Sequence, residues 1–484
     1  MLSKNRCRLA VFVAVTVVAM SMPTTAWAGA PSIPTGLTAT PGNAQVALAW
    51  TVPSDTGGGD GIDTYHVEYS IDALAWTRVV RANSTVVAYT VTGLTNGTAY
   101  QFRVSAVNGA DIGPWSATAS GAPVASFSAT DLATFSACPT AAIPAAGFTD
   151  STLSEVNCIA YYGITKGTTA TTYSPLDPVT RWQMALFLTR MATRAGITLG
   201  DGSDQGFADI GGYSAEIRTA INQIKQLGIT VGKTATTYAP ADNVLRSELA
   251  LFLTRLLKKA TAGPGGNEEY VSGTSGPKEI KSLITNHNFT DINQGTYETR
   301  DAVVNLWNLG VTDSQALTTY EPNSVMDRRA MARFMANALA HTNARPKGLL
   351  LQASSYWMQT GSTVKLSVTH RADDFSAITG SSVDTFRFNY STVSTVIRFD
   401  QSSNTLVAGT CTTYITATTV GNVKCTVDTT DPKTDANGNL AVFQEIPPTV
   451  NKVDVWAWTA TPTATYDNDV HATAASKVTV ETHS

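Results

Sequence analysis

Apolar residues in the middle of the chain recur at helical spacing in three separate segments. In the first segment Met184, Phe187, Leu188 and Met191 lie three or four positions apart, which places them on one face of a helix. The same spacing returns twice, at Leu249, Phe252, Leu253 and Leu256 and at Met331, Phe334, Met335 and Leu339. The pattern predicts three amphipathic helices that each bury one face.

A second helix and a turn are predicted before each of these segments. The earlier helices are expected at 155–162, 216–227 and 298–309, and each runs up to a glycine that suits a left-handed helix terminus. A Tyr-x-Pro turn follows, and an arginine comes 18 residues after the glycine in every copy, pairing Gly163 with Arg181, Gly228 with Arg246 and Gly310 with Arg328. This regularity indicates one structural unit of about forty residues used three times.

The arginine of each copy stands in the first turn of its helix. A cation there opposes the backbone dipole by about 0.3–1 kcal/mol, so three such positions suggest a compensating anion. A helix N-terminus with an arginine forms a good site for a carboxylate or phosphate. The alternative, compatible with the first, is that the arginines pair with acids of their own copies, namely Asp150, Asp209 and Asp291.

The residues that begin these helices are only partly kept between copies. Thr180 and Gln183 form a capping-box pair in the first copy. The second copy keeps an acid, Glu248, at the third helical position, and the third copy keeps an acidic cap, Asp327, but has alanine at the box position. The third copy therefore reads as degraded, and its groove is expected to be weak or purely structural.

These elements together resemble the S-layer homology (SLH) family. The resemblance covers 138–342, with repeats at about 138–195, 203–260 and 279–342, and rests on Phe-x-Asp, Gly-Ile/Val, Tyr-x-Pro and Thr-Arg-x-Glu/Gln motifs. It implies an all-α, pseudo-threefold trimer of repeats whose grooves bind an anionic, typically pyruvylated secondary cell-wall polysaccharide, or peptidoglycan. The family's groove residues would map onto Arg181, Arg246, Arg328, Asp150, Asp209 and Asp291. An insertion at 261–278 is expected to be a flexible loop.

Period-two patterns flank the helical centre on both sides. Residues 31–124 alternate as a β-sandwich does, and the stretch from Leu94 to Val104 resembles the tyrosine corner of a fibronectin type III domain, with Trp50 and Tyr100 as core residues. Residues 125–137 are expected to form a linker. The chain is thus predicted to be a multidomain α+β protein.

Residues 347–484 are predicted to form a second all-β sandwich that loosely resembles bacterial immunoglobulin-like (Ig-like) domains. The segment 435–439 reads as a hairpin turn, with a calcium loop as the weaker alternative because the spacing is not that of an EF-hand. Trp456 and Trp458 share one face of a strand, where core packing is favoured over stacking on sugar rings.

The first 28 residues read as an export signal. A basic start precedes a short apolar core, and Ala26-Trp27-Ala28 offers a cleavage site. No later apolar run approaches the length that spans a bilayer. Export makes oxidation plausible, so Cys138 and Cys158, and likewise Cys411 and Cys425, are expected to form disulfides, with a metal site as the alternative.

The remaining chemistry argues against catalysis. The net charge of −4, without a basic stripe, speaks against nucleic acid as a partner. No nucleophile elbow, zinc-protease motif, Walker loop or dinucleotide fingerprint occurs, and the six histidines are scattered. We therefore expect no enzyme, cofactor or metal site.

The sequence thus favours a secreted protein of the cell wall or cell surface. It is expected to bind wall polysaccharide non-covalently through its three repeats and to display β-sandwich modules. Two alternatives stay open. One is a self-assembling surface-layer subunit, and the other is an adhesin or carbohydrate-binding protein that acts through its last domain.

Overall fold

The computed structural model describes most of the chain after the predicted export signal. The described residues are 29–58, 61–109, 111–125, 127–271, 275–312, 318–390, 395–400, 405–406, 412–416, 419–424, 432–445, 452–459 and 475–483. The predicted signal at 1–28 and the cysteines at 411 and 425 lie outside them. The chain divides into two compact units, Met1–Ser126 and Phe127–Ser484.

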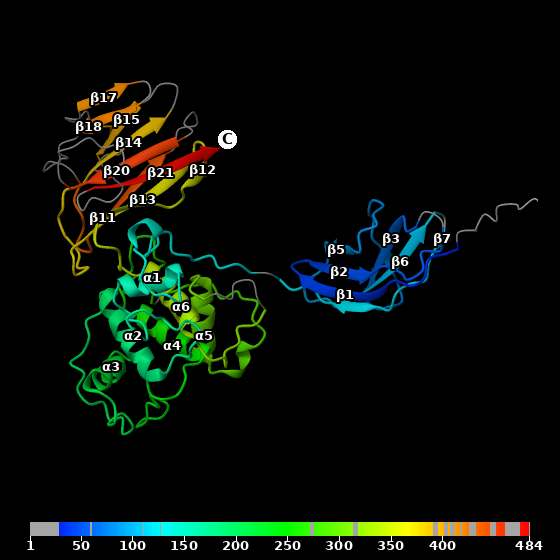
Figure 1. Ribbon diagram of the computed structural model, residues 1–484, viewed down its shortest axis with the longest axis horizontal. Helices are drawn as coiled ribbons and strands as arrows, with labels where there is room; N and C mark the ends of the chain where they lie inside the picture. Colours follow the sequence, from blue (N-terminus) through cyan, green and yellow to red (C-terminus); the bar gives the residue numbers. More distant parts are fainter. Residues whose placement is uncertain are drawn as a thin grey trace, which may run out of the picture. The chain divides into compact units, whose positions relative to one another are not determined.

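The first unit is a β-sandwich (Figure 1). Its strands are β1 Thr35–Gly42, β2 Gln45–Thr51, β3 Thr64–Ser70, β4 Thr77–Arg78, β5 Ala88–Thr92, β6 Tyr100–Asn108, β7 Asp111–Ile112 and β8 Ala119–Gly121. One sheet has the order β1-β2-β5 and the other β4-β3-β6-β7, with β8 beside β6. Trp50 and Tyr100 are buried between the sheets, as predicted, and the Tyr100 hydroxyl accepts a hydrogen bond from the Thr95 amide at 3.1 Å.

The second unit begins with a helical part that contains the three repeated copies. Its elements are η1 Thr140–Ala142, α1 Ser154–Tyr161, α2 Arg181–Arg194, α3 Ala215–Gln226, α4 Arg246–Leu257, β9 Glu269–Tyr270, β10 Lys278–Glu279, η2 Ile292–Gln294, α5 Tyr297–Asn308 and α6 Arg328–His341. Each earlier helix lies one residue before its predicted range. Gly163, Gly228 and Gly310 have φ angles of 69°, 71° and 70°, the left-handed conformation expected of them.

The helices of different copies pack against each other in a cycle. The first helix of copy two, α3, packs on α2 of copy one, and α5 of copy three packs on α4 of copy two. The cycle closes where α1 of copy one packs on α6 of copy three. Each copy therefore buries its first helix against its neighbour in the cycle.

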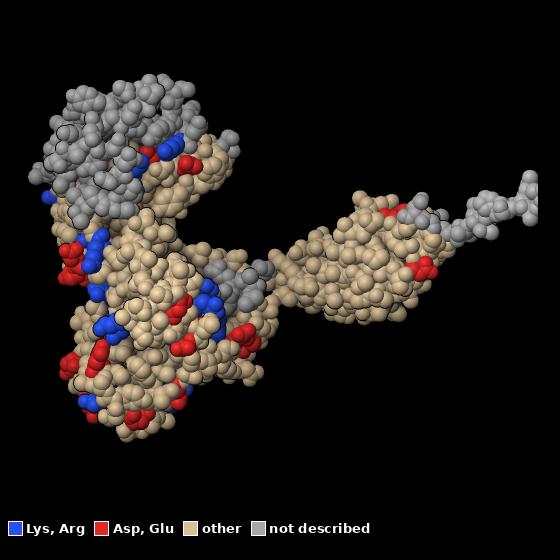
Figure 2. Space-filling model, in the orientation of Figure 1, with Lys and Arg blue, Asp and Glu red and all other residues tan. Residues whose placement is uncertain are grey.

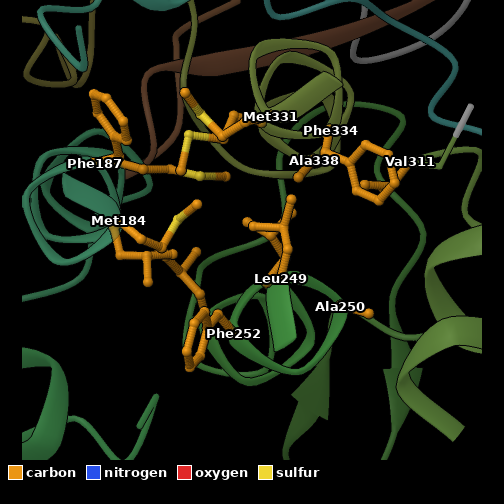
Figure 3. Close-up of a cluster of buried hydrophobic side chains, with 14 of the residues drawn as sticks. Met184, Phe187, Leu249, Ala250, Phe252, Val311, Met331, Phe334 and Ala338 are labelled. Carbon is orange, nitrogen blue, oxygen red and sulfur yellow. The ribbon is translucent and has the colours of Figure 1, made fainter. Parts of the chain in front are cut away.

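The apolar faces predicted from the sequence meet in one shared core. Figure 3 shows Met184 from α2, Leu249 from α4 and Met331 from α6 pointing into a common cluster. All three side chains are completely buried, as are Leu188, Leu253 and Met335 one turn later in the same helices. Burial of such side chains stabilises the fold by about 1.5–3 kcal/mol each.

Described parts of the insertion between copies two and three, where the sequence predicts a flexible loop, have regular structure. Its strands β9 and β10 pair antiparallel. The Gly263 amide donates to the His341 carbonyl oxygen at 2.9 Å, and the Asn267 amide donates to His341 Nδ1 at 3.1 Å. These bonds tie the insertion to the end of α6.

The C-terminal part of the second unit consists of β-strands. They are β11 Gly348–Ala353, β12 Trp357–Gln359, β13 Thr363–Arg371, β14 Asp384–Tyr390, β15 Thr395–Asp400, β16 Thr405–Leu406, β17 Thr412–Thr416, β18 Thr419–Lys424, β19 Asn439–Glu445, β20 Lys452–Trp458 and β21 Ala475–His483. Sheets of order β11-β13-β19 and β12-β21-β20-β14-β15-β16 share one apolar core, and β17 pairs with β18. Trp456 is buried, as predicted, and Gly438 (φ 67°) completes the turn at 435–439.

Two groups join the helical and β parts of this unit. Phe375, from a loop after β13, lies with its ring 5.4 Å from that of Tyr161 and 5.2 Å from that of Tyr162, under the Arg194 guanidinium. The completely buried Arg345 donates hydrogen bonds to carbonyl oxygens at the end of α6 and to that of Pro264. Its charge therefore offsets the negative end of the helix dipole.

Candidate functional site

Each of the three predicted aspartates stabilises a turn by accepting hydrogen bonds from its backbone amides. Asp209 accepts hydrogen bonds from the amides of Tyr238 and Ala239 at 2.9 and 2.7 Å. Asp150 makes the same two bonds to Tyr173 and Ser174, and Asp291 makes them to Tyr320 and Glu321. The backbone bond from Tyr173 is the main cause that lowers the pKa of Asp150. Each carboxylate thus fixes the Tyr-x-Pro turn of its own copy.

The three predicted arginines each reach the turn of the next copy. Arg181 Nε donates to the Tyr238 carbonyl oxygen at 2.8 Å, and its guanidinium lies 4.7 Å from the centroid of the Tyr238 ring. In the same way Arg246 Nε donates to the Tyr320 carbonyl oxygen at 2.9 Å, and Arg328 Nε donates to the Tyr173 carbonyl oxygen at 2.7 Å. We call the contacts of Arg181, Arg246 and Arg328 the first, second and third interface.

The arginines do not pair with the aspartates of their own copies. Within the described residues none of the ion pairs joins Asp150, Asp209 or Asp291 to an arginine, and both carboxylate oxygens of each accept hydrogen bonds from turn amides. That alternative from the sequence analysis is therefore wrong. The aspartate orients the arginine indirectly, by holding the tyrosine on which the guanidinium stacks.

Backbone hydrogen bonds close the same cycle next to the arginines. The Val244 amide donates to the Val179 carbonyl oxygen, Met326 donates to Val244, and Val179 donates to Met326, all at 2.8–2.9 Å. The tyrosine hydroxyls also donate back to the carbonyl oxygens of the arginines that contact them. Each interface is thus held by side-chain and backbone bonds in both directions.

The first interface neutralises its own arginine. Arg181 is 2% exposed, and its Nη1 donates to Glu248 Oε1 at 3.0 Å. Lys233 Nζ donates to the same oxygen at 2.7 Å, and Glu248 Oε2 caps α4 by accepting from the Leu245 amide. The carboxylate of copy two therefore satisfies two cations and a helix terminus at once.

The third interface lacks that carboxylate. The residue of copy one that corresponds to Glu248 is Gln183, whose Oε1 caps α2 by accepting from the Thr180 amide at 3.1 Å. Arg328 is 2% exposed, and its Nη2 has no hydrogen-bond partner among the described residues. Burial lowers the pKa of Arg328. A buried, charged donor without a partner is costly, by about 1–3 kcal/mol or more.

The second interface has neither acid nor amide at this place. The residue of copy three that corresponds to Glu248 is Ala330. Arg246 is partly exposed, stacks 4.8 Å from the centroid of the Tyr320 ring, and makes further interactions besides its bond to the Tyr320 carbonyl oxygen. The three interfaces thus share the contact between arginine and tyrosine and differ in the charge of the residue that corresponds to Glu248.

The sequence pointed to the arginines and to the acid at Glu248, but not to the hydrogen bonds that Glu248 accepts from Arg181 and Lys233. Lys233 gave no signal because it occurs in one copy, where the first copy has Thr168. The pairing of Glu248 with the arginine of the preceding copy could not be read from spacing within a copy. The buried Arg345 also passed unnoticed, since it follows the last repeat.

The helical part also contains a disulfide. Cys138 and Cys158 are bonded, which confirms the first predicted bridge. On the face drawn in Figure 2, acidic and basic side chains are mixed over the helical part. Within the described ranges no helix has the length and hydropathy to cross a bilayer, and no group of three or more His, Cys, Asp or Glu residues could hold a metal ion.

Two family models match parts of the chain. The model of the fibronectin type III domain matches residues 32–122, and that of the S-layer homology domain matches residues 206–250. The second range lies within the second copy and contains Asp209, Lys233, Arg246 and Glu248. Members of the S-layer homology family generally bind cell-wall polysaccharide.

Two curated relatives share the fibronectin type III region. Exoglucanase A of Cellulomonas fimi is 46% identical over 78 residues, which are 16% of this chain and 8% of the relative. Exoglucanase B of the same organism is 44% identical over 82 residues, which are 17% of this chain and 7% of the relative. The chain thus spans less than a tenth of either relative, and the matches lie outside their catalytic regions.

Solved structures resemble the chain over about a fifth of its length. Domains A168-A170 of titin are 32% identical, with 20% of this chain and 32% of that chain covered and a TM-score of 0.18. An Fn3-like protein from Clostridium thermocellum is 31% identical, with 19% and 92% covered and a TM-score of 0.16. The two family models, by themselves, give the chain a fibronectin type III domain and an S-layer homology domain, a combination that fits a cell-surface protein.

Proposed function

We propose that this is a secreted, non-enzymatic cell-envelope protein that three S-layer homology repeats hold on cell-wall polysaccharide. The observation that carries the proposal is the cycle of arginine–tyrosine contacts between the three copies. All three copies place an arginine, a tyrosine and an aspartate in the same geometry as the copy that the family model matches. The C-terminal β part, which loosely resembles Ig-like domains, and the fibronectin type III domain would be displayed by this anchor.

The partner is an anionic secondary wall polysaccharide, pyruvylated in the form that the family resemblance implies, or peptidoglycan. Arg181, Arg246 and Arg328 each begin a helix, where the helix N-terminus and the guanidinium together favour a carboxylate. At Arg181 the carboxylate of Glu248 already takes this place. A hydrogen bond to a charged group contributes about 1.5–3 kcal/mol. Asp150, Asp209 and Asp291 support this site by holding the turns, and several weak contacts on one polymer add avidity.

Sedimentation with isolated walls tests the proposal. Residues 29–484 should sediment with native walls of the source organism and stay in solution after mild acid has removed the secondary polymer. Equal sedimentation with native and acid-extracted walls would contradict the proposed partner, and no sedimentation with native walls would contradict anchoring itself.

A further inference from the structure

The β part of the second unit contains a cavity that the proposed function does not use. Its volume is 710 Å³, within the range of about 300–1,000 Å³ that is typical of ligand sites, and it is lined by the segment 134–142 and by strands β11 and β21. Buried side chains of the sandwich core, such as Leu351 and Val478, form an apolar part of the lining. Thr140 and Tyr356 also line the cavity and are exposed, so it is open to solvent.

One side of this cavity is a strand edge without a partner. Strand β12 pairs with β21 only from Glu481 to His483, where the Glu481 amide donates to the Tyr356 carbonyl oxygen at 3.0 Å (Figure 1). Because backbone groups alternate in direction along a strand, the amides and carbonyl oxygens of Lys477 and Thr479 face the same edge as those of Glu481. Within the described ranges these two residues make no backbone hydrogen bond on that side.

The side chain of Lys477 does not shield this edge. Proteins commonly protect an open strand edge with a lysine that projects from it. Here Lys477 Nζ lies 2.9 Å from Asp454 Oδ2 and 4.8 Å from the centroid of the Trp456 ring. Both partners belong to β20, which pairs with the opposite edge of β21. The lysine therefore leans away from the cavity and leaves the edge accessible.

We propose that this cavity is a docking site in which an extended segment of a partner protein pairs with the open edge of β21, in line with β12. Such a segment supplies amides and carbonyl oxygens at the spacing of a strand, about 3.3 Å per residue, which the backbone groups of Lys477 and Thr479 require. The pairing of β12 shows that this edge accepts a further strand.

The cavity also determines which side chains the partner segment should carry. Side chains alternate along a strand, so every second one would point toward the apolar lining at Leu351 and Val478. The segment is therefore expected to alternate apolar and polar residues. The inference goes beyond wall binding, because a chain anchored in this way would hold a second protein at the cell surface.

Peptides selected on the full chain test this site. A phage-displayed library of random peptides of about ten residues, the upper length of most strands, is selected on residues 29–484. Enriched peptides are synthesised, and their affinity is measured by fluorescence anisotropy. We expect them to alternate apolar and polar residues and to lack a central proline, which cannot donate to a strand pair. Failure to enrich any peptide would overturn the inference.

Two threonines offer a blocked variant and its matched control. Thr140→Trp should fill the cavity and weaken binding of the selected peptides about ten-fold or more, because the lost strand pairing removes several backbone hydrogen bonds. Thr363→Trp, at an exposed position of β13 outside the cavity, should bind them as the native chain does. Equal affinities of the two variants would place the peptides elsewhere and contradict the site.

N-methylated peptides test the pairing without any change in the protein. Methyl groups on alternate amides remove the donors that face β21 in one series and those that face away in the other. The first series should lose affinity about ten-fold or more, and the second should keep it. Similar losses in both series would show that the peptides do not bind as a strand.

Hydrogen exchange identifies the edge and the occupant. The amides of Lys477 and Thr479 should exchange rapidly in the free chain and slowly with a selected peptide, whereas Val478, in the ladder with β20, should exchange slowly in both. Unchanged exchange of Lys477 and Thr479 would overturn the inference. Slow exchange of both amides without peptide, together with a dimer in analytical ultracentrifugation, would identify a second copy of this chain as the occupant and contradict the partner proposed here.

Discussion

A buried side chain in this protein takes its charge state from its partners in space. His341 is 1% exposed, its Nε2 lies 2.8 Å from the Leu309 carbonyl oxygen, and its Nδ1 accepts from the Asn267 amide. The ring must therefore be neutral, with its proton on Nε2. The pKa is lowered to about 4, chiefly by burial and also by the nearby Arg345, while the Leu309 bond and Asp131 oppose the shift.

His341 should make the stability of the second unit depend on pH. Its pKa of about 4 in the folded state lies below the ordinary 6.5, so the unfolded chain binds the proton first as pH falls. Stability that is present above pH 6.5 is lost on acidification and levels off near pH 4. Urea unfolding between pH 7 and 4 should show a slope of up to about 1.4 kcal/mol per pH unit from this group. His341→Gln should lack that component, and identical slopes would contradict the assignment.

At the scale of single elements, the Tyr-x-Pro turns are folded by their aspartates against a local strain. Ser174, Ala239 and Glu321 all have positive φ angles, of 56°, 56° and 59°. An L-residue in this conformation costs about 1–2 kcal/mol. The two hydrogen bonds that each aspartate accepts from the turn amides offset the cost, and the turn presents the tyrosine to the arginine of the preceding copy.

Replacing the strained residue of one turn should stabilise the helical part. Ala239→Gly relieves the left-handed strain, while the added freedom of the unfolded chain costs only about 0.4–1 kcal/mol. We expect a net gain of about 0.5–1 kcal/mol in the free energy of unfolding, measured with guanidinium chloride. Ala235→Gly, at an exposed position without positive φ, should give no gain. A loss of stability in Ala239→Gly would contradict the view that backbone strain at this position destabilises the protein.

At the scale of the whole second unit, the cycle of copies determines how the helical part unfolds. The contact between Arg328 and Tyr173 joins residues 155 positions apart and returns copy three to copy one. Because each copy packs its first helix on another copy, none of them has a complete core alone. The three copies are therefore expected to unfold together.

Loss of one ring-closing bond should destabilise all three copies. Tyr173→Phe leaves the buried Arg328 carbonyl oxygen without the hydroxyl that donates to it at 2.7 Å. We expect a loss of about 1–3 kcal/mol, seen as one shifted transition in circular dichroism. Tyr297→Phe, whose side chain is 75% exposed, is the control. Equal stabilities of the two variants would mean that the closing bond contributes nothing.

Much of the helical fold could be read from the chain because its signals are local. The period of Met184, Phe187 and Leu188 predicted α2 and its buried face, and Gly163 predicted where α1 ends, since both follow from backbone geometry along a few residues. The insertion has no such local signal, because its hydrogen bonds to His341 join it to a helix that is distant in the sequence.

By itself the sequence determined the elements, their threefold repetition, the first disulfide and the presence of an arginine at the start of each second helix. Only the tertiary structure decided that these arginines stack on the tyrosine of the next copy, and that one of them bonds Glu248 while the corresponding residue of the copy that Arg328 contacts is Gln183. The reason is physical. Helix periodicity and capping depend on neighbours in the chain, whereas the charge balance of an interface depends on which copy closes against which.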